Sequence, residues 1–204
     1  MRPEATRVLT ADGIIVAFDT SAAHCAAALM FGGKVITRVE VMAKGQAERL
    51  VPMLEEVLAE AGVIWADVSA IVVGTGPGNF TGIRISVALA RGLALGLRIP
   101  AVGVSGFEAL AHDIDRPVVI ALDAPRGQAY VQGFTPNGAG PAEIAEIAPP
   151  GARRMSDLAL PQFIVALAMA GQRKLATEQP RPAPFYLRDA DAAPPADPPP
   201  VILS

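Results

Sequence analysis

The central signal in the sequence lies in residues 74–97, GTGPGNFTGIRISVALARGLALGL, where a glycine-rich loop leads into a long apolar helix. Glycines permit sharp turns and close backbone approach, and the free N–H groups at a helix start attract anions. No Gly-Lys-Ser/Thr follows, so the loop is not a P-loop. Two interpretations stay open: a phosphate contact, or a sharp turn with Asn79 or Thr81 as the N-cap of the helix.

The helix that follows the loop, residues 80–97, is apolar on every side. Small residues form two stripes along it, one through Gly82, Ser86, Ala90 and Ala94 and the other through Ala88, Gly92 and Gly96. If half of its large side chains faced water, the burial forgone would be roughly 5 to 10 kcal/mol, comparable to the net stability of a domain. Another helix of this chain or a second subunit therefore covers it, and the small stripes favour a subunit.

The residues before the loop predict three antiparallel strands and a helix. Apolar and alternating stretches at 14–20, 25–31 and 34–41 read as the strands. Apolar residues then recur at helical spacing up to Gly62, and they are Leu50, Met53, Leu54, Val57, Leu58 and Ala61. With further strands at 68–74 and 101–104, the order becomes βββαβαβ, which implies a central sheet covered by helices.

A second unit begins at Pro117 with a predicted strand at 118–123 and a return strand at 128–134. A Gly/Pro-rich loop at 138–151 and a helix at 161–173 follow, and eight prolines in 179–204 predict irregular structure there. We therefore expect a flexible extension (1–13), a first lobe (14–112), a shortened second lobe (113–178) and a proline-rich tail (179–204).

Composition excludes several classes of protein. A single cysteine among 204 residues rules out an internal disulfide and indicates a cytoplasmic, reducing compartment. A formal net charge of −3 and 5% aromatic residues do not fit an autonomous nucleic-acid binder, so any RNA contact is expected through a partner. Arg84 and Arg91 interrupt the longest apolar run, which argues against a membrane span.

Polar residues give no obvious catalytic constellation. The run Asp19-Thr20-Ser21 follows the first strand and could hold a hydrated metal or a phosphate, or could make an ordinary turn. His24 and His112 have no second ligand at metal spacing. No Gly-x-Ser-x-Gly elbow is present, so a serine nucleophile is not indicated.

Six short segments together resemble the TsaB family, formerly called YeaZ. They are FDTS (18–21), QAERLVPML (46–54), GPGNFTGIR (76–84), IPAVGVS (99–105), ALDA (121–124) and FYLR (185–188). The resemblance runs from about residue 14 to the end. It implies an α/β, two-lobed actin-like ATPase (ASKHA) fold, also described as ribonuclease H-like.

The family's function is that of a non-catalytic subunit in the bacterial complex that forms N6-threonylcarbamoyladenosine (t6A) at position 37 of tRNA. The resemblance implies a heterodimer with the catalytic subunit TsaD, and a homodimer when TsaD is absent. It also implies that the ATPase TsaE joins the assembly and that TsaC supplies threonylcarbamoyl-adenylate. Contact with tRNA would then be indirect, through the complex.

The resemblance also bears on metal binding. TsaD carries Val-Asn-His-Leu-Glu-Gly-His after the corresponding strand, and its two histidines hold a metal. Here the matching segment, 104–110, has Gly106 and Leu110 at those positions. His112 lies two residues further, about 200° around a helix, and would not substitute. We therefore expect no catalytic residues and no metal site in this chain.

Two sets of site residues follow. A vestigial nucleotide site would involve Asp19, Thr20, Gly76, Gly78 and Thr81, with no cofactor required and a nucleotide at the subunit interface left open. A partner interface would use residues of both helices of the first lobe: Leu50, Met53, Leu54, Val57, Ile85, Ala88, Leu89, Gly92 and Gly96.

Two other functions compete with the scaffold role. One is an ATP-dependent phosphotransferase of the same superfamily, with Asp19 organising a metal and residues 76–82 touching phosphate. The other is a peptidase of the glycoprotease-like M22 group, against which the missing metal ligands and the missing nucleophile-base pair both argue.

Overall fold

The computed structural model describes residues 13–188, so residues 1–12 of the extension predicted at 1–13 and residues 189–204 of the tail predicted at 179–204 lie outside the described residues. Five strands form the first sheet in the order β3-β2-β1-β4-β5, with β1, β2 and β3 antiparallel and β4 and β5 parallel to β1. The strands are β1 (Ile14–Asp19), β2 (His24–Phe31), β3 (Lys34–Val41), β4 (Val68–Gly74) and β5 (Ala101–Val104). The predicted βββαβαβ order and the α/β class are confirmed.

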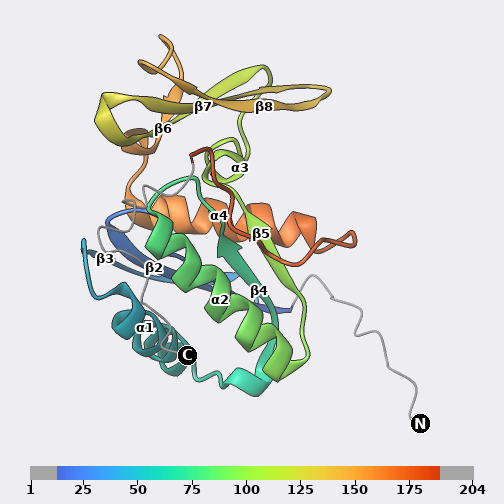
Figure 1. Ribbon diagram of the computed structural model, residues 1–204. Coiled ribbons are helices and arrows are strands. Elements are labelled where there is room, and N and C mark those ends of the chain that lie inside the picture. Colours follow the sequence, from blue (N-terminus) through green and yellow to red (C-terminus); the bar gives the residue numbers. More distant parts are fainter. Residues whose placement is uncertain (1–12, 189–204) are drawn as a thin grey trace, which may run out of the picture.

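Helices cover both faces of this sheet (Figure 1). Helices α1 (Gln46–Ala61) and α2 (Phe80–Leu97) pack on one face, and α4 (Leu160–Lys174) packs on the other. Alternate residues of β1 point to opposite sides, with Phe18 toward α1 and α2 and Ala17 toward α4. Burial on both faces explains why the central strands read as continuous apolar runs.

The second sheet has the strand order β8-β7-β6-β9. In Figure 1 the short helix α3 (Gly106–Leu110) lies between the two sheets. The strands of the second sheet are β6 (Val118–Asp123), β7 (Ala129–Thr135), β8 (Gly138–Ala145) and β9 (Arg153–Arg154). The prediction of a loop over 138–151 was wrong for β8, because an exposed edge strand pairs through its backbone and needs no apolar pattern. Pro141 is tolerated at such an edge.

Helix α4 follows the second sheet in the chain but packs on the first. Gly171 makes this possible, since a Cβ at that position would overlap the side chain of Val72 in β4. Our sequence-based boundary at residue 113 groups this helix with the second lobe, whereas its strand contacts are with β1 to β5. Within residues 13–188, the second sheet is instead contacted by the short helix α3, which packs against β6.

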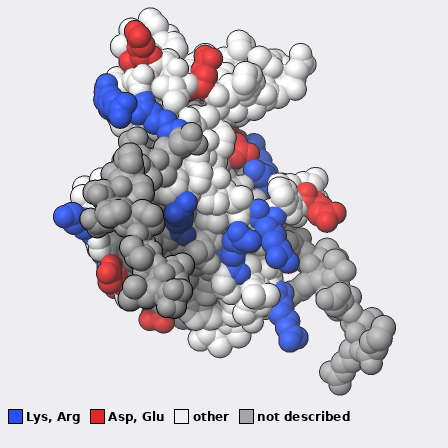
Figure 2. Space-filling view, in the orientation of Figure 1, with Lys and Arg blue, Asp and Glu red and all other residues white. Residues whose placement is uncertain are grey.

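After α4, residues 177–188 form an irregular segment that we call the C-terminal strap. The Phe185 N–H donates to the Thr75 carbonyl at 2.8 Å, and Arg188 bonds the side chain of Gln128, which directly precedes β7 of the second sheet. The strap therefore ties the glycine-rich loop to the second sheet. Figure 2 shows this face, with basic side chains gathered over α2 and the strap although the whole chain carries a net charge of −3.

Candidate functional site

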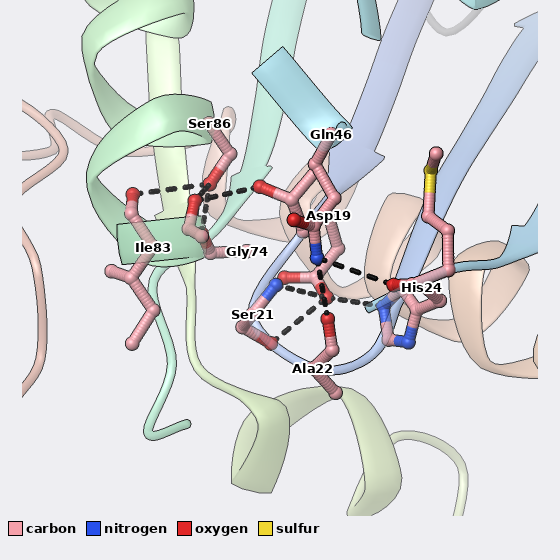
Figure 3. Close-up of polar contacts among 11 residues, drawn as sticks. Asp19, Ser21, Ala22, His24, Gln46, Gly74, Ile83 and Ser86 are labelled. Carbon is pink, nitrogen blue, oxygen red and sulfur yellow. Dashed lines mark hydrogen bonds and ion pairs between the residues drawn. The ribbon is translucent and has the colours of Figure 1, made fainter. Parts of the chain in front are cut away.

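The carboxylate of Asp19 lies at the centre of a buried polar cluster in the β1–β2 turn (Figure 3). Its Oδ2 accepts hydrogen bonds from the Ser21 N–H at 3.1 Å and the Ser21 hydroxyl at 2.8 Å, and it meets His24 Nε2 at 2.7 Å. Asp19 is 1% exposed and His24 is 3% exposed. Ser21 and His24 each bond this carboxylate, and no hydrogen bond joins them to one another within residues 13–188, so they do not form a nucleophile-base pair.

The glycine-rich loop packs directly against this turn. Three of its glycines leave no space for a side chain, because a Cβ at each would overlap atoms of the turn. The pairs are Gly74 with Asp19 Oδ1, Gly78 with the Ser21 carbonyl, and Gly82 with the Thr20 carbonyl. These glycines are therefore required by the close approach of two segments of this chain, independently of any phosphate.

Hydrogen bonds hold the loop and the turn together. Thr20 donates its hydroxyl to the Gly82 carbonyl at 2.6 Å, and the Asn79 N–H donates to the Ser21 carbonyl at 2.6 Å. The Asn79 side chain accepts from the Gly82 N–H at 2.8 Å, which makes Asn79, rather than Thr81, the N-cap of α2. The polar groups expected to face a phosphate are engaged with the chain itself.

The five residues predicted for a vestigial nucleotide site do not converge on one cavity. Asp19 and Thr20 are buried, whereas Gly78 and Thr81 are exposed. At Gly76 the backbone is left-handed with φ 99°, and a Cβ there would lie 3.0 Å from the strap carbonyl of Phe185. Two cavities border the strap, of about 730 and 410 Å³, and none of the five lines either one.

The predicted partner residues on α1 need correction. Leu50, Met53, Leu54 and Val57 are all 0% exposed and pack between α1 and the first sheet. An amphipathic helix has one apolar face, and here the core of this chain uses it. These four side chains therefore cannot contact another subunit while this fold is intact.

The predicted partner residues on α2 lie differently. Ala88, Gly92 and Gly96 are exposed, and Ile85 and Leu89 are half-buried beside them. A Cβ built at Gly92 or Gly96 would have nothing within 4 Å. We call these five residues, together with Leu95, which is 80% exposed, the α2 face.

The two small stripes of α2 are thus used in different ways. Gly82, Ser86 and Ala90 are buried against this chain, while the stripe through the α2 face is not covered by any of residues 13–188. By length and composition alone α2 is apolar enough to cross a membrane. In the fold, that apolar composition is divided between the core and the α2 face.

Outside the β1–β2 turn, the pKa values of ionisable side chains are set by ion pairing or by burial. Arg49 of α1 bonds Glu40 of β3 and Glu56 of its own helix, and this pairing holds the pKa of both carboxyls below their ordinary values. Burial raises the pKa of the Cys25 thiol to about 11, which makes it unreactive. Burial also lowers the pKa of His112.

Metal donors are scarce in the described part of the chain. No group of three or more histidine, cysteine, aspartate or glutamate side chains within residues 13–188 is placed to hold a metal ion. At the positions matched to the TsaD histidines, Leu110 is buried in the core and Gly106 packs against Leu122. Neither offers a lone pair for coordination.

Comparison with known proteins gives three findings. Residues 35–187 match the family model described as "TsaD: tRNA N6-adenosine threonylcarbamoyltransferase". The tRNA threonylcarbamoyladenosine biosynthesis protein TsaB of Escherichia coli K12 is 36% identical over 121 residues, and that of Bacillus subtilis 168 is 38% identical over 120; each alignment covers 57% of this chain and 52% of the relative. YeaZ from Pseudomonas aeruginosa superposes with a TM-score of 0.69 at 26% identity, over 86% of this chain and 100% of that structure. The chain spans about half the length of the curated relatives it matches.

Proposed function

This chain belongs to the TsaB (YeaZ) family, and on that premise we propose that it acts in the formation of threonylcarbamoyladenosine on tRNA as a non-catalytic subunit that binds TsaD. The observation that carries the proposal is the α2 face. It is apolar, solvent-exposed in the described chain, and built around small residues that let another helix approach closely.

The glycines of the α2 face favour a docking role over a structural one. A glycine in an exposed helix interior costs about 0.8 to 1 kcal/mol relative to alanine. Gly92 and Gly96 touch nothing in their own fold that a Cβ would disturb. A partner helix that packs across this stripe gives a physical reason for their presence, with Leu89 and Leu95 as the larger contacts.

The polar cluster supports a non-catalytic role. Asp19 bonds Ser21 and His24 within a buried turn and faces neither described cavity. The same observations weaken the phosphotransferase alternative, which requires that carboxylate to organise a metal beside the loop. The peptidase alternative lacks a serine-histidine contact in the turn.

The proposal is tested by placing a charged side chain in the α2 face. Gly92→Arg should abolish co-purification with the organism's TsaD, because the arginine side chain fills the space required for a close helix approach. The isolated variant should still melt cooperatively, since the site is open. Asn137→Arg, on the exposed β7–β8 turn of the second sheet, adds the same charge and should leave co-purification unchanged.

Reconstitution tests the role in modification. With TsaD, TsaE, TsaC and tRNA present, omission of this chain should abolish or strongly reduce formation of the modified adenosine. Gly92→Arg should behave like omission, and Asn137→Arg like the wild type. Unchanged complex formation by Gly92→Arg, or full modification without this chain, would contradict the proposal.

A further inference from the structure

A row of arginines follows the flank of α2 that faces the C-terminal strap. Arg84, Arg91 and Arg98 recur every seven residues, so successive side chains lie about 10 Å apart along the helix. Arg181 of the strap lines the same cavity as Arg91 and Arg98. Within residues 13–188 none of the four forms an ion pair with a carboxylate, whereas Arg38 and Arg49 each pair with two.

The cavity beside this row has the size and lining of a ligand site. It measures about 730 Å³ and lies between the second half of α2, the start of β5 and residues 175–182. Leu95, Ile99 and Leu175 contribute apolar surface, and Glu178 is the only acidic residue among those of 13–188 that line it. Ligand sites commonly have volumes of about 300 to 1,000 Å³ and a mostly apolar lining with a few polar groups.

An aromatic platform stands at the other end of the row. The rings of Phe80 and Tyr186 stack with centroids 4.5 Å apart, and the Arg84 guanidinium lies 3.8 Å from the centroid of the Phe80 ring. Arg84 Nε also donates to the Tyr186 hydroxyl at 3.1 Å. Tyr186 remains 36% exposed, so its ring is accessible at the surface.

We propose that this surface, the arginine row of Arg84, Arg91, Arg98 and Arg181 with its cavity and aromatic platform, binds the backbone of an RNA strand. Unpaired arginines in a line attract successive phosphates, and the planar guanidinium matches phosphate geometry. The exposed Tyr186 ring and the apolar part of the cavity accept unstacked bases, which is how proteins hold single-stranded RNA. An acidic peptide would use the charges but would leave the platform and the cavity without a role.

The proposal deepens the proposed function, on which it rests, because it places the RNA substrate of the complex directly on this chain. Ile85 and Leu89 pack toward α1, whereas Gly92 and Leu95 of the α2 face also line the cavity beside the arginine row. The two surfaces therefore adjoin at the cavity, and RNA binding is measured in the absence of TsaD. The sequence does not reveal this cluster of arginines, because acidic residues elsewhere in the chain bring the net charge to −3.

The test measures RNA binding by the full-length chain without TsaD. Fluorescence anisotropy with a labelled transcript of the organism's tRNA should give a dissociation constant that rises with salt, with a slope of log Kd against log salt of about +2 to +3 for three or four phosphate contacts. The variant R91E/R98E/R181E should bind at least tenfold more weakly. The control K34E/K44E/R154E changes the net charge equally at exposed sites elsewhere and should stay within twofold of the wild type.

Three outcomes would overturn the RNA proposal: no binding by the wild type at low salt, an equal loss in the control, or binding of a polyglutamate peptide as tight as that of RNA. If R91E/R98E/R181E fails to fold, R91Q/R98Q/R181Q provides the test, because it removes the positive charges without introducing negative ones. Capture of TsaD by the same variants is measured separately. Loss of RNA binding with capture retained separates this proposal from the scaffold role.

Discussion

Asp19 and His24 stand five residues apart across the β1–β2 turn and meet at 2.7 Å inside the protein. The Ser21 N–H, the Ser21 hydroxyl and the His24 ring nitrogen all meet the same oxygen of this carboxylate, Oδ2. Gly74 is required beside it, because a Cβ there would overlap Asp19 Oδ1. At the residue scale, these contacts hold the β1–β2 hairpin against the glycine-rich loop.

Asp19→Ala should therefore be strongly destabilising. It leaves the Ser21 N–H and the His24 ring without their buried partner, and each unsatisfied group costs about 1 to 3 kcal/mol. We expect the free energy of unfolding in urea to fall by about 2 to 4 kcal/mol in total. Ser21→Ala removes a single donor and should cost about 1 kcal/mol. An Asp19→Ala chain as stable as the wild type would show that the carboxylate is free for another task.

The buried thiol of Cys25 predicts a pH dependence. Desolvation raises its pKa from 9.0 to about 11, partly offset by the charge of Arg49. Because the folded chain keeps the thiol proton to higher pH than the unfolded chain does, this contribution to stability is complete below pH 9 and is lost as the pH rises toward 11. Cys25→Ala should show a smaller decline in urea stability over that window, and parallel declines would contradict the assignment.

At the scale of single elements, α2 combines a core helix with an exposed surface. Its inner stripe fits the chain so tightly that a Cβ at Gly82 would overlap the Thr20 carbonyl, while Gly92 and Gly96 face open space. Alanine in place of a buried glycine of α2 and alanine in place of an exposed one should therefore change the stability of the chain in opposite directions.

Gly92→Ala and Gly96→Ala should each stabilise the isolated chain by about 0.5 to 1 kcal/mol, because alanine restricts the unfolded chain and favours the helix. Gly82→Ala should destabilise it, since the new methyl group has no room. Thermal unfolding of the three variants distinguishes these cases. If both outer substitutions lowered the melting temperature, the α2 face would have to be covered within the chain.

Sequence periodicity predicted which elements form but only part of what their faces contact. The apolar spacing located α1 and α2, and Gly62 marked the end of α1 correctly. Leu50, Met53, Leu54 and Val57 were assigned to a partner interface because a core-facing stripe and a partner-facing stripe look alike in sequence. Only the fold shows that these four side chains are enclosed by the first sheet.

At the scale of the whole molecule, contacts between residues far apart in the sequence determine which segments meet. The sequence pattern does not predict these contacts. Helix α4 covers the first sheet after a detour through the second, and the strap returns to place Phe185 against Thr75. The FYLR segment signalled the family but gave no sign of this contact, because its partners lie about one hundred residues earlier. The pairing of His24 with Asp19 was also missed, since a hairpin brings them together.

The whole molecule then presents two surfaces on one helix. The α2 face is apolar and built on small residues, and the arginine row beside it is basic and bordered by the strap (Figure 2). Because the polar groups of the turn are engaged internally, these surfaces, rather than a reactive centre, are where the described chain meets other molecules in our account.

Site-specific photocrosslinking tests that account most directly. A benzophenone side chain at position 95, where Leu95 is 80% exposed on the α2 face, is compared with the same group at Asn137 on the second sheet. On irradiation with TsaD, we predict a covalent heterodimer from position 95 and none from position 137. No crosslink to TsaD from position 95, or equal yields from both positions, would contradict the claim that TsaD docks on α2.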